Sequence, residues 1–307
     1  MKLSIVTTLY KSAPFVEEFY KRASAAAQKI GGDYEIVMVD DGSPDHSLLQ
    51  ACRIAQADPR VRVVELSRNF GHHKALMTGL AHAGGELVFL IDSDLEEAPE
   101  LLNQFYERIQ VDDCDVVYGF QERRKGNAWE RVSGQIAWYL INRLSSVEIP
   151  MNQSTVRLMR RAYVDALLLH RENNVAILGL CALTGFHQAG FPISKGHRRN
   201  PSYTFLHRLV VLANAITSFS TVPLIGVTYL GLIISIISFI LGLVVIAQKL
   251  IYNSAIGWAS TMVSIWFVGG MIMFCLGILS AYISRIFDET KNRPYVIVRR
   301  IHQKDRG

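Results

Sequence analysis

The stretch ELVFLIDSDLEE, from Glu86 to Glu97, joins an apolar run to a dense group of acidic residues. The run from Leu87 to Ile91 is short and continuous, which is typical of a strand that is covered on both faces of a sheet. Asp92 and Asp94 follow it directly. Carboxylates do not stabilise an apolar core, so this stretch predicts a buried strand that ends at a polar, ligand-binding edge.

The same alternation of apolar runs with helical patterns fills the N-terminal part of the chain. It predicts an α/β fold in which right-handed crossovers connect the strands of a mostly parallel sheet. The expected strands cover residues 3–9, 35–40, 61–66, 86–92 and 115–119, and the expected helices cover residues 14–30, 45–57, 72–83 and 99–110.

Polar residues stand where three of these strands end. Asp40 and Asp41 end the second run, Arg68 follows the third, and Asp92 and Asp94 follow the fourth. Ligands of such sheets bind beyond the carboxyl ends of the strands, so these side chains are expected to share one site. For Asp40 and Asp41 a tight turn that caps the next helix fits equally well, and both roles are compatible.

The spacing Asp92-Ser93-Asp94 places two carboxylates one residue apart in a loop. Hard divalent cations that bind together with phosphates prefer such oxygen ligands, and they make a diphosphate a better leaving group. The alternative is that the acidic residues of this stretch stabilise the N-terminus of the next helix, as Glu96 and Glu97 are expected to do. The adjacent His72 and His73 have poor geometry for joint metal binding and are interpreted as loop residues.

Two long apolar segments lie near the C-terminus, Pro223–Ala247 and Ala255–Ile283, and neither contains Lys, Arg, Asp or Glu. Each is longer than the roughly 20 residues that a membrane-spanning helix needs. The short link QKLIYNS makes them a transmembrane hairpin, and basic residues flank it on both sides, which predicts cytoplasmic flanks. No charged and then apolar leader opens the sequence, so we expect no cleaved signal peptide.

Composition supports a membrane protein of a reducing compartment. The chain has 307 residues, of which 50% are hydrophobic, and a formal net charge of +5. The basic excess lies beside the apolar segments and has no nucleic-acid reader motif, so no nucleic-acid partner is expected. The four cysteines have no paired spacing, which argues against disulfides and a zinc site.

Three motifs carry a resemblance to a known family. They are VDDGSPDHS at Val39–Ser47, LSRNFGHHKALMTGL at Leu66–Leu80 and LIDSDLEEAPELL at Leu90–Leu102. In this order, and together with the hairpin and the RIFDETKNRPYVIV tail, they resemble the family 2 glycosyltransferases of the GT-A fold. Within these, the chain is similar to the polyisoprenyl-phosphate glycosyltransferases, the group of bactoprenol glucosyltransferase and dolichol-phosphate mannose synthase.

The resemblance implies a nucleotide-sugar donor, here a UDP-sugar, and a Mg²⁺ or Mn²⁺ ion on Asp92 and Asp94, with Asp94 in a catalytic role. Lys74 either reaches a donor phosphate or faces water. The donor-binding residues that the resemblance implies are Thr8, Tyr10, Asp40, Asp41, Arg68, Lys74, Asp92 and Ser93.

Two departures from the family pattern affect the site. Tyr10-Lys11-Ser12 stands where the family usually has Tyr-Asn-Glu, and Thr155 stands where an acid is often proposed as catalytic base. A phosphate acceptor, with a second pKa of about 6, is largely deprotonated at neutral pH and needs no such base. It needs cations to position it. The candidates are Arg157, Lys195, Arg198 and Arg199, with Arg157 and Arg198 favoured for catalysis; Lys195 and Arg199 serve equally well as lipid anchors.

The predicted organisation has four parts: a cytoplasmic GT-A domain (residues 1–202), an interfacial amphipathic helix (203–222), the transmembrane hairpin (223–284, with spans at 223–247 and 255–283) and a basic cytoplasmic tail (285–307). Residues 129–144 are also amphipathic, and core packing is an alternative for both amphipathic segments. The resemblance places such a chain in the bacterial inner (cytoplasmic) membrane as a multi-pass protein and a homo-oligomer.

The expected function is inverting transfer of a sugar, by default glucose, to polyprenyl (undecaprenyl) phosphate at the cytoplasmic membrane face. Alternatives are a transferase that uses GDP-mannose or a UDP-amino sugar, and a catalytically weak scaffold subunit of a lipid-linked sugar export system. A processive polysaccharide synthase is disfavoured, because the chain lacks a Gln-x-x-Arg-Trp motif and has too few spans for a channel.

Overall fold

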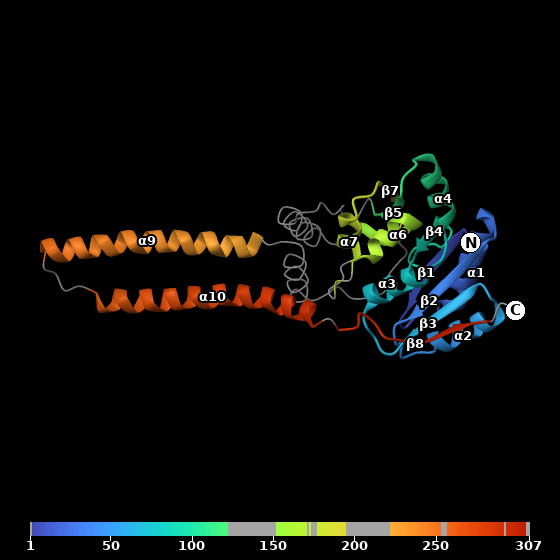
Figure 1. Cartoon of the computed structure of the whole chain (residues 1–307), viewed down its shortest axis with the longest axis horizontal. Helices are drawn as coiled ribbons and strands as arrows, with labels where there is room; N and C mark the ends of the chain where they lie inside the picture. Colours follow the sequence, from blue (N-terminus) through green and yellow to red (C-terminus); the bar gives the residue numbers. More distant parts are fainter. Residues whose placement is uncertain are drawn as a thin grey trace. The chain divides into compact units, whose positions relative to one another are not determined.

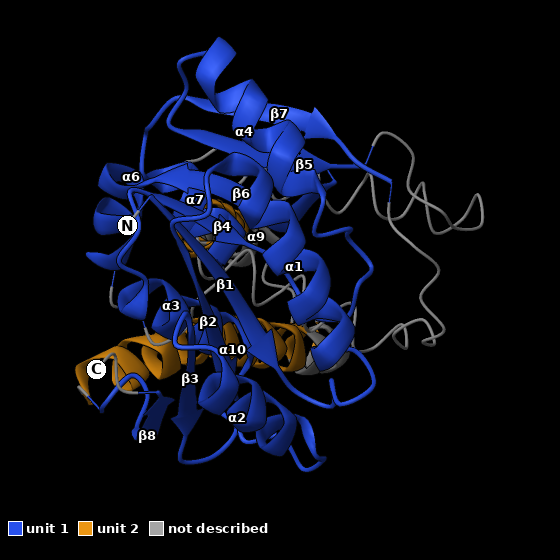
Figure 2. Ribbon diagram, turned by 90° about the vertical axis from the view of Figure 1, so that its right-hand side faces the viewer, with its two compact units in different colours: residues 1–138, 147–203, 293–307 blue, residues 139–146, 204–292 orange. Residues whose placement is uncertain are grey.

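A computed structural model describes residues 2–121, 152–170, 172, 177–194, 222–252, 257–291 and 293–304. The chain divides into two compact units, which are coloured separately in Figure 2. The α/β unit comprises residues 1–138, 147–203 and 293–307, and the helical unit comprises residues 139–146 and 204–292.

The α/β unit is built on one sheet with the strand order β7-β5-β6-β4-β1-β2-β3-β8. Its parallel centre consists of β1 (Leu3–Leu9), β2 (Tyr34–Asp40), β3 (Val61–Leu66) and β4 (Leu87–Leu90). Every residue of β1 and β2 is buried. Their continuous apolar sequences therefore fit strands that helices cover on both faces.

Helices cross between these strands, as the sequence predicted (Figure 1). The predicted helix ends agree with the observed ones to within two residues. One face of the sheet packs against side chains of three helices, and α3 packs on the other face. The helices are α1 (Val16–Ile30), α2 (Ser47–Ala57), α3 (His72–His82) and α4 (Leu101–Val111).

The second half of the sheet is mixed. After β5 (Val116–Phe120), strand β6 (Gln153–Arg160) runs antiparallel to both β4 and β5, and β7 (Gln188–Pro192) pairs parallel with β5. Helices α6 (Arg161–Leu168) and α7 (Ile177–Leu183) join the α3 face.

The direction of β6 decides which residues meet at the site. The parallel strands β1, β2, β3 and β4 end at the same edge of the sheet, which we call the carboxyl edge. Because β6 runs the other way, with Arg157 opposite Leu90, its first residues lie at this edge. Ser154 and Thr155 are thereby brought next to the acidic loop that follows β4.

The last described strand, β8 (Val298–Gln303), lies in the segment predicted as a basic tail. It pairs antiparallel with β3 and forms one border of the sheet. Ser67 N donates to Ile297 O at 2.9 Å, and His302 Nε2 lies 2.9 Å from Glu65 Oε2. This strand was not predicted, because the basic residues of the segment suggested a cytoplasmic tail rather than a sheet border.

The helical unit contains α9 (Val222–Tyr252) and α10 (Trp258–Thr290). At 1.5 Å per residue the 31 residues of α9 span about 46 Å, more than the ~30 Å hydrocarbon core of a bilayer. The stretches Leu224–Leu241 and Ser264–Thr290 are unburied, and they are long and apolar enough to cross a membrane. Helix α9 extends beyond the predicted span at both ends, and α10 continues past Ile283, where the second predicted span ends.

Candidate active site

Asp40 ends β2 at the carboxyl edge and is 2% exposed. Its Oδ2 accepts a hydrogen bond from Ser43 N at 3.4 Å, whereas its Oδ1 accepts none from the part of the chain that the structure describes. Burial raises the pKa of Asp40 to about 6, and the charges of Glu65 and Asp41 act in the same direction. A buried oxygen that lacks a donor is suited to bind a polar ligand group.

Asp41 holds the loop that follows β3. Its two carboxylate oxygens accept hydrogen bonds from the main-chain N–H groups of Phe70, at 2.7 Å, and Gly71, at 3.0 Å. Burial raises the pKa of Asp41, and these two hydrogen bonds oppose the rise. Its observed role is to fix the loop, and its contact with a nucleotide stays a prediction.

Gly42 lies where the β2 turn and this loop meet. Its φ is +61°, and a Cβ at this position would lie 2.6 Å from both Arg68 C and Asn69 N. Main-chain atoms cannot move aside as the end of a flexible side chain can. Glycine is therefore required here both for its backbone conformation and for space.

We expect Gly42→Ala to destabilise the protein by about 3 kcal/mol and to weaken donor binding, because the Arg68 loop must shift. Gly32→Ala is the matched control, since Gly32 has a φ of +75° but no atom within 4 Å of the added Cβ. The control should lose only about 1 kcal/mol of stability, which is the cost of backbone strain alone. Melting curves of the whole protein in detergent measure the difference; equal losses would show that the close approach is unimportant.

Three further donor-site candidates lie on the segments around this edge. Tyr10 is 47% exposed, and the Arg68 guanidinium lies 4.1 Å from the centroid of the Phe70 ring. Lys74 Nζ lies 5.3 Å from the ring centroid of Tyr295, a residue of the segment that leads into β8. The C-terminal segment thus contacts a residue for which the sequence left two roles open.

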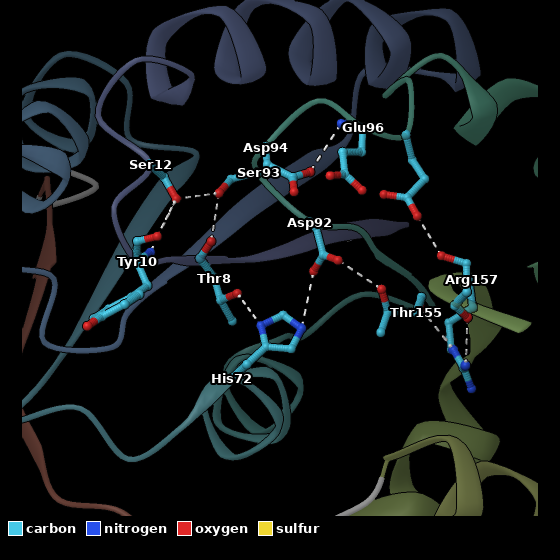
Figure 3. A network of polar contacts seen from close by, with 12 residues as sticks. Thr8, Tyr10, Ser12, His72, Asp92, Ser93, Asp94, Glu96, Thr155 and Arg157 are labelled. Atoms are coloured by element: carbon cyan, nitrogen blue, oxygen red, sulfur yellow. Dashed lines mark hydrogen bonds and ion pairs between the residues drawn. The ribbon is translucent and has the colours of Figure 1, made fainter. Parts of the chain in front are cut away.

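The three residues of the D-x-D sequence point in different directions (Figure 3). Asp92 faces His72 and Thr155, while Asp94 Oδ1 accepts a hydrogen bond from Glu96 N at 3.1 Å. Ser93 is buried, and its Oγ donates to Thr8 O at 2.8 Å. Ser93 therefore ties the acidic loop to the end of β1, and its predicted contact with the donor stays untested.

Asp92 is partly buried between α3 and β6. Thr155 Oγ1 donates to Asp92 Oδ2 at 3.0 Å, and His72 Nε2 lies 3.4 Å from Asp92 Oδ1. Burial is the main cause that raises the pKa of Asp92, the charges of Glu97 and Asp94 add to it, and His72 and the Thr155 hydroxyl oppose it.

His72 is a site residue that the sequence analysis missed. It was interpreted as a loop residue, but it is the first residue of α3, and its Nδ1 lies 3.1 Å from Thr8 Oγ1. That interpretation was wrong because it considered only joint metal binding with His73. The available signal was position, since the first residue of a helix that follows a parallel strand lies at the carboxyl edge.

Two further charged residues have surroundings that differ from the predicted ones. Glu97, expected to stabilise a helix N-terminus, is buried and accepts a hydrogen bond from Ser154 Oγ at 2.5 Å; α4 begins only at Leu101, after the N-cap residue Glu100. Arg157 is 0% exposed. Its guanidinium donates to Thr155 O at 3.1 Å and Ser154 O at 3.2 Å, and its Nη1 finds no acceptor among the described residues.

The remaining acceptor-site candidates, Lys195, Arg198 and Arg199, lie outside the described residues, as do the amphipathic segments 129–144 and 203–219. Arg157 is thus the one predicted acceptor-site cation within the described part of the chain.

The donor set of the acidic loop fits a hard divalent cation. Asp92 Oδ1 is buried and accepts no hydrogen bond from the described residues, and the approach of His72 Nε2 at 3.4 Å is its one ion-pair contact among them. In the described ranges, no group of three His, Cys, Asp or Glu side chains forms a metal cluster. That pattern suits Mg²⁺ or Mn²⁺, which proteins often hold through one or two carboxylates while substrate phosphates complete the shell.

A mostly parallel sheet with an acidic D-x-D loop at its carboxyl edge places the protein among the GT-A transferases, which confirms the predicted fold class. Residues 4–168 match the family described as Glycosyl transferase family 2. The chain belongs to this family and is a glycosyltransferase.

Named relatives match over nearly the whole chain. A glycosyltransferase of Mycobacterium tuberculosis is 48% identical over 99% of this chain and 90% of the relative. The SfII prophage-derived bactoprenol glucosyl transferase of Shigella flexneri is 32% identical over 99% of both chains. Among solved structures, S. aureus TarS 1-349 superposes with a TM-score of 0.46 at 20% identity, covering 72% of this chain and 73% of that one.

Proposed function

We propose that the protein transfers a sugar, by default glucose, from a UDP-sugar to polyprenyl phosphate at the cytoplasmic face of the membrane. The observation that carries the proposal is the polar carboxyl edge, with its D-x-D loop, in the same chain as two helices long enough to span a bilayer. The full-length similarity to proteins named bactoprenol glucosyl transferase supports this acceptor class.

The donor nucleotide is assigned to the loops after β1, β2 and β3. The free Oδ1 of Asp40 accepts an N–H or O–H group of the base or ribose, and exposed Tyr10, directly after β1, offers an aromatic surface. Arg68, on the loop that Asp41 holds, supplies positive charge toward the diphosphate. A Mg²⁺ or Mn²⁺ ion held by Asp92 and Asp94 would neutralise the diphosphate as it leaves.

The reaction is a single inverting displacement. An oxygen of the acceptor phosphate forms a bond to the anomeric carbon, while the bond to the nucleoside diphosphate breaks and the diphosphate leaves with the electron pair. The nucleophile carries no proton at neutral pH, since the second pKa of a phosphate monoester is about 6. Thr155 is therefore compatible with activity although it cannot act as a base.

The basic residues predicted to bind the acceptor phosphate have two different roles. Fully buried Arg157 braces the main chain of Ser154 and Thr155, so we assign it to positioning these residues. Arg198 is then the first candidate to contact the acceptor phosphate, with Lys195 and Arg199 beside it. A polyprenyl chain stays in the bilayer, so an enzyme that uses it gains from a membrane anchor such as α9 and α10.

Transfer from radiolabelled donors tests this function. Whole protein in detergent is incubated with undecaprenyl phosphate, Mg²⁺ or Mn²⁺, and a panel of UDP- and GDP-sugars. We expect product from a UDP-sugar, and loss of product with EDTA, because the D-x-D carboxylates need the cation to bind the diphosphate. Transfer from a GDP-sugar alone would move the assignment to a mannose-type donor, and no product from any donor would support the scaffold alternative.

A further inference from the structure

The carboxylate of Asp92 is contacted on both oxygens by side chains from different elements. Thr155, on β6, donates to Oδ2 at 3.0 Å, and His72, at the start of α3, approaches Oδ1 at 3.4 Å (Figure 3). Neither residue is adjacent to Asp92 in sequence; the antiparallel run of β6 and the start of α3 bring them together. Two contacts from opposite sides restrict the rotation of the carboxylate.

His72 is itself oriented by a third residue. Its Nδ1 lies 3.1 Å from Thr8 Oγ1, and Thr8 lies on β1. In the tautomer with the proton on Nε2, that N–H faces Asp92 and Nδ1 accepts a hydrogen bond from the Thr8 hydroxyl. The contacts from Thr8 to His72 and from His72 to Asp92 thus fix the plane of the imidazole ring as well as the position of the carboxylate.

The side chain at position 155 also helps to orient Asp92. A carboxylate at this position would place a second negative charge against Asp92, whereas the Thr155 hydroxyl donates to it. Arg157 fixes the carbonyl groups of Ser154 and Thr155, so the hydroxyl is presented from a braced strand. Outer residues that orient a ligating carboxylate strengthen metal binding.

We propose that His72 and Thr155 are positioning residues that orient Asp92 toward the divalent cation. The proposal rests on the proposed function, which assigns that cation to Asp92 and Asp94. In this chain position 155 therefore serves the metal-binding carboxylate and takes no proton from the acceptor.

Mn²⁺ binding tests the proposal without measuring transfer. The electron paramagnetic resonance signal of free Mn²⁺ is followed as whole protein in detergent is titrated in the presence of UDP. We expect His72→Ala and Thr155→Val each to weaken Mn²⁺ binding about 10-fold, as loss of outer-shell partners does. Thr8→Val removes the contact that orients His72 and should have a smaller effect in the same direction.

Conservative variants separate positioning from a general structural role. Thr155→Ser keeps the hydroxyl and His72→Gln keeps an N–H donor, so both should restore much of the affinity. His82→Gln, in the last turn of α3, is the matched control and should bind Mn²⁺ like the wild type. A melting temperature for every variant identifies any that fails to fold.

Unchanged Mn²⁺ affinity in folded His72→Ala and Thr155→Val would overturn the proposal while leaving the metal site intact. Absence of Mn²⁺ binding by the wild type would instead refute the metal part of the proposed function, and the positioning role with it. Asp94→Ala provides the reference for a site that has lost a ligand.

Discussion

Asp94→Ala is expected to lower the rate of sugar transfer about 1,000-fold, to the background of the assay. Removing a group that stabilises charge in a transition state costs about 10²–10³-fold, and loss of a metal ligand also lowers occupancy by the ion. The single described hydrogen bond of the carboxylate is to Glu96 N at 3.1 Å, so the protein should lose only about 1 kcal/mol of stability. Transfer at saturating donor, with a melting curve for the same preparation, measures both effects.

Asp94→Asn keeps the shape and removes the charge, so it should be nearly as inactive as the alanine variant. Asp113→Asn is its matched control, because the Asp113 side chain is 95% exposed and lies before β5, away from the carboxyl edge. Transfer by Asp94→Asn at the wild-type rate, still inhibited by EDTA, would mean that the cation binds elsewhere. Transfer that EDTA leaves unchanged in the wild type would remove the cation from the proposal.

Asp40→Asn is expected to stabilise the protein at pH 7.5 and to impair donor binding. Burial raises the pKa of Asp40 from 3.8 to about 6, so the folded protein binds this proton more tightly than the unfolded chain does. Wild-type stability therefore falls by about 3 kcal/mol as the pH rises from below 4 to above 6. The asparagine variant has no titrating group at this position, so its stability should not decrease in this way.

The measurement is the difference in melting temperature between variant and wild type, in detergent, from pH 4 to pH 7.5. We expect the difference to grow in favour of the variant by about 6–12 °C, most of it between pH 4 and 6. UDP titration at pH 7.5 should show about 10-fold weaker binding, because a neutral amide replaces the carboxylate acceptor. A difference that does not vary with pH would mean that Asp40 titrates normally in the fold.

The parallel half of the sheet could be predicted from sequence because its strands are continuous apolar runs and its helices follow a clear period. The D-x-D loop could be placed at the carboxyl edge for the same reason. The partners of Asp92 could not, because His72 and Thr155 lie 20 residues before it and 63 residues after it. The contact of Thr155 with Asp92 depends on the antiparallel direction of β6, which a local pattern does not encode.

Positive charge guided the interpretation in two places. The residues of β8 were assigned to a basic cytoplasmic tail because Lys and Arg are frequent in residues 285–307, whereas in the structure Arg299 and His302 pair with Glu65 of β3. Arg157 was assigned to the acceptor phosphate because that phosphate needs cations to position it. The structure provides main-chain carbonyl groups for its guanidinium, an arrangement that leaves no trace in the sequence.

The position of β8 in the chain has a consequence for biosynthesis. A ribosome makes β3 early, but the strand that pairs with its open side follows α9 and α10, so it emerges only after both apolar helices have been made. Until then β3 presents unpaired main-chain groups, which are a template for aggregation. Closure of the sheet border is thereby delayed until the apolar helices have left the ribosome, so a nascent chain arrested before residue 298 would hold an incomplete catalytic sheet.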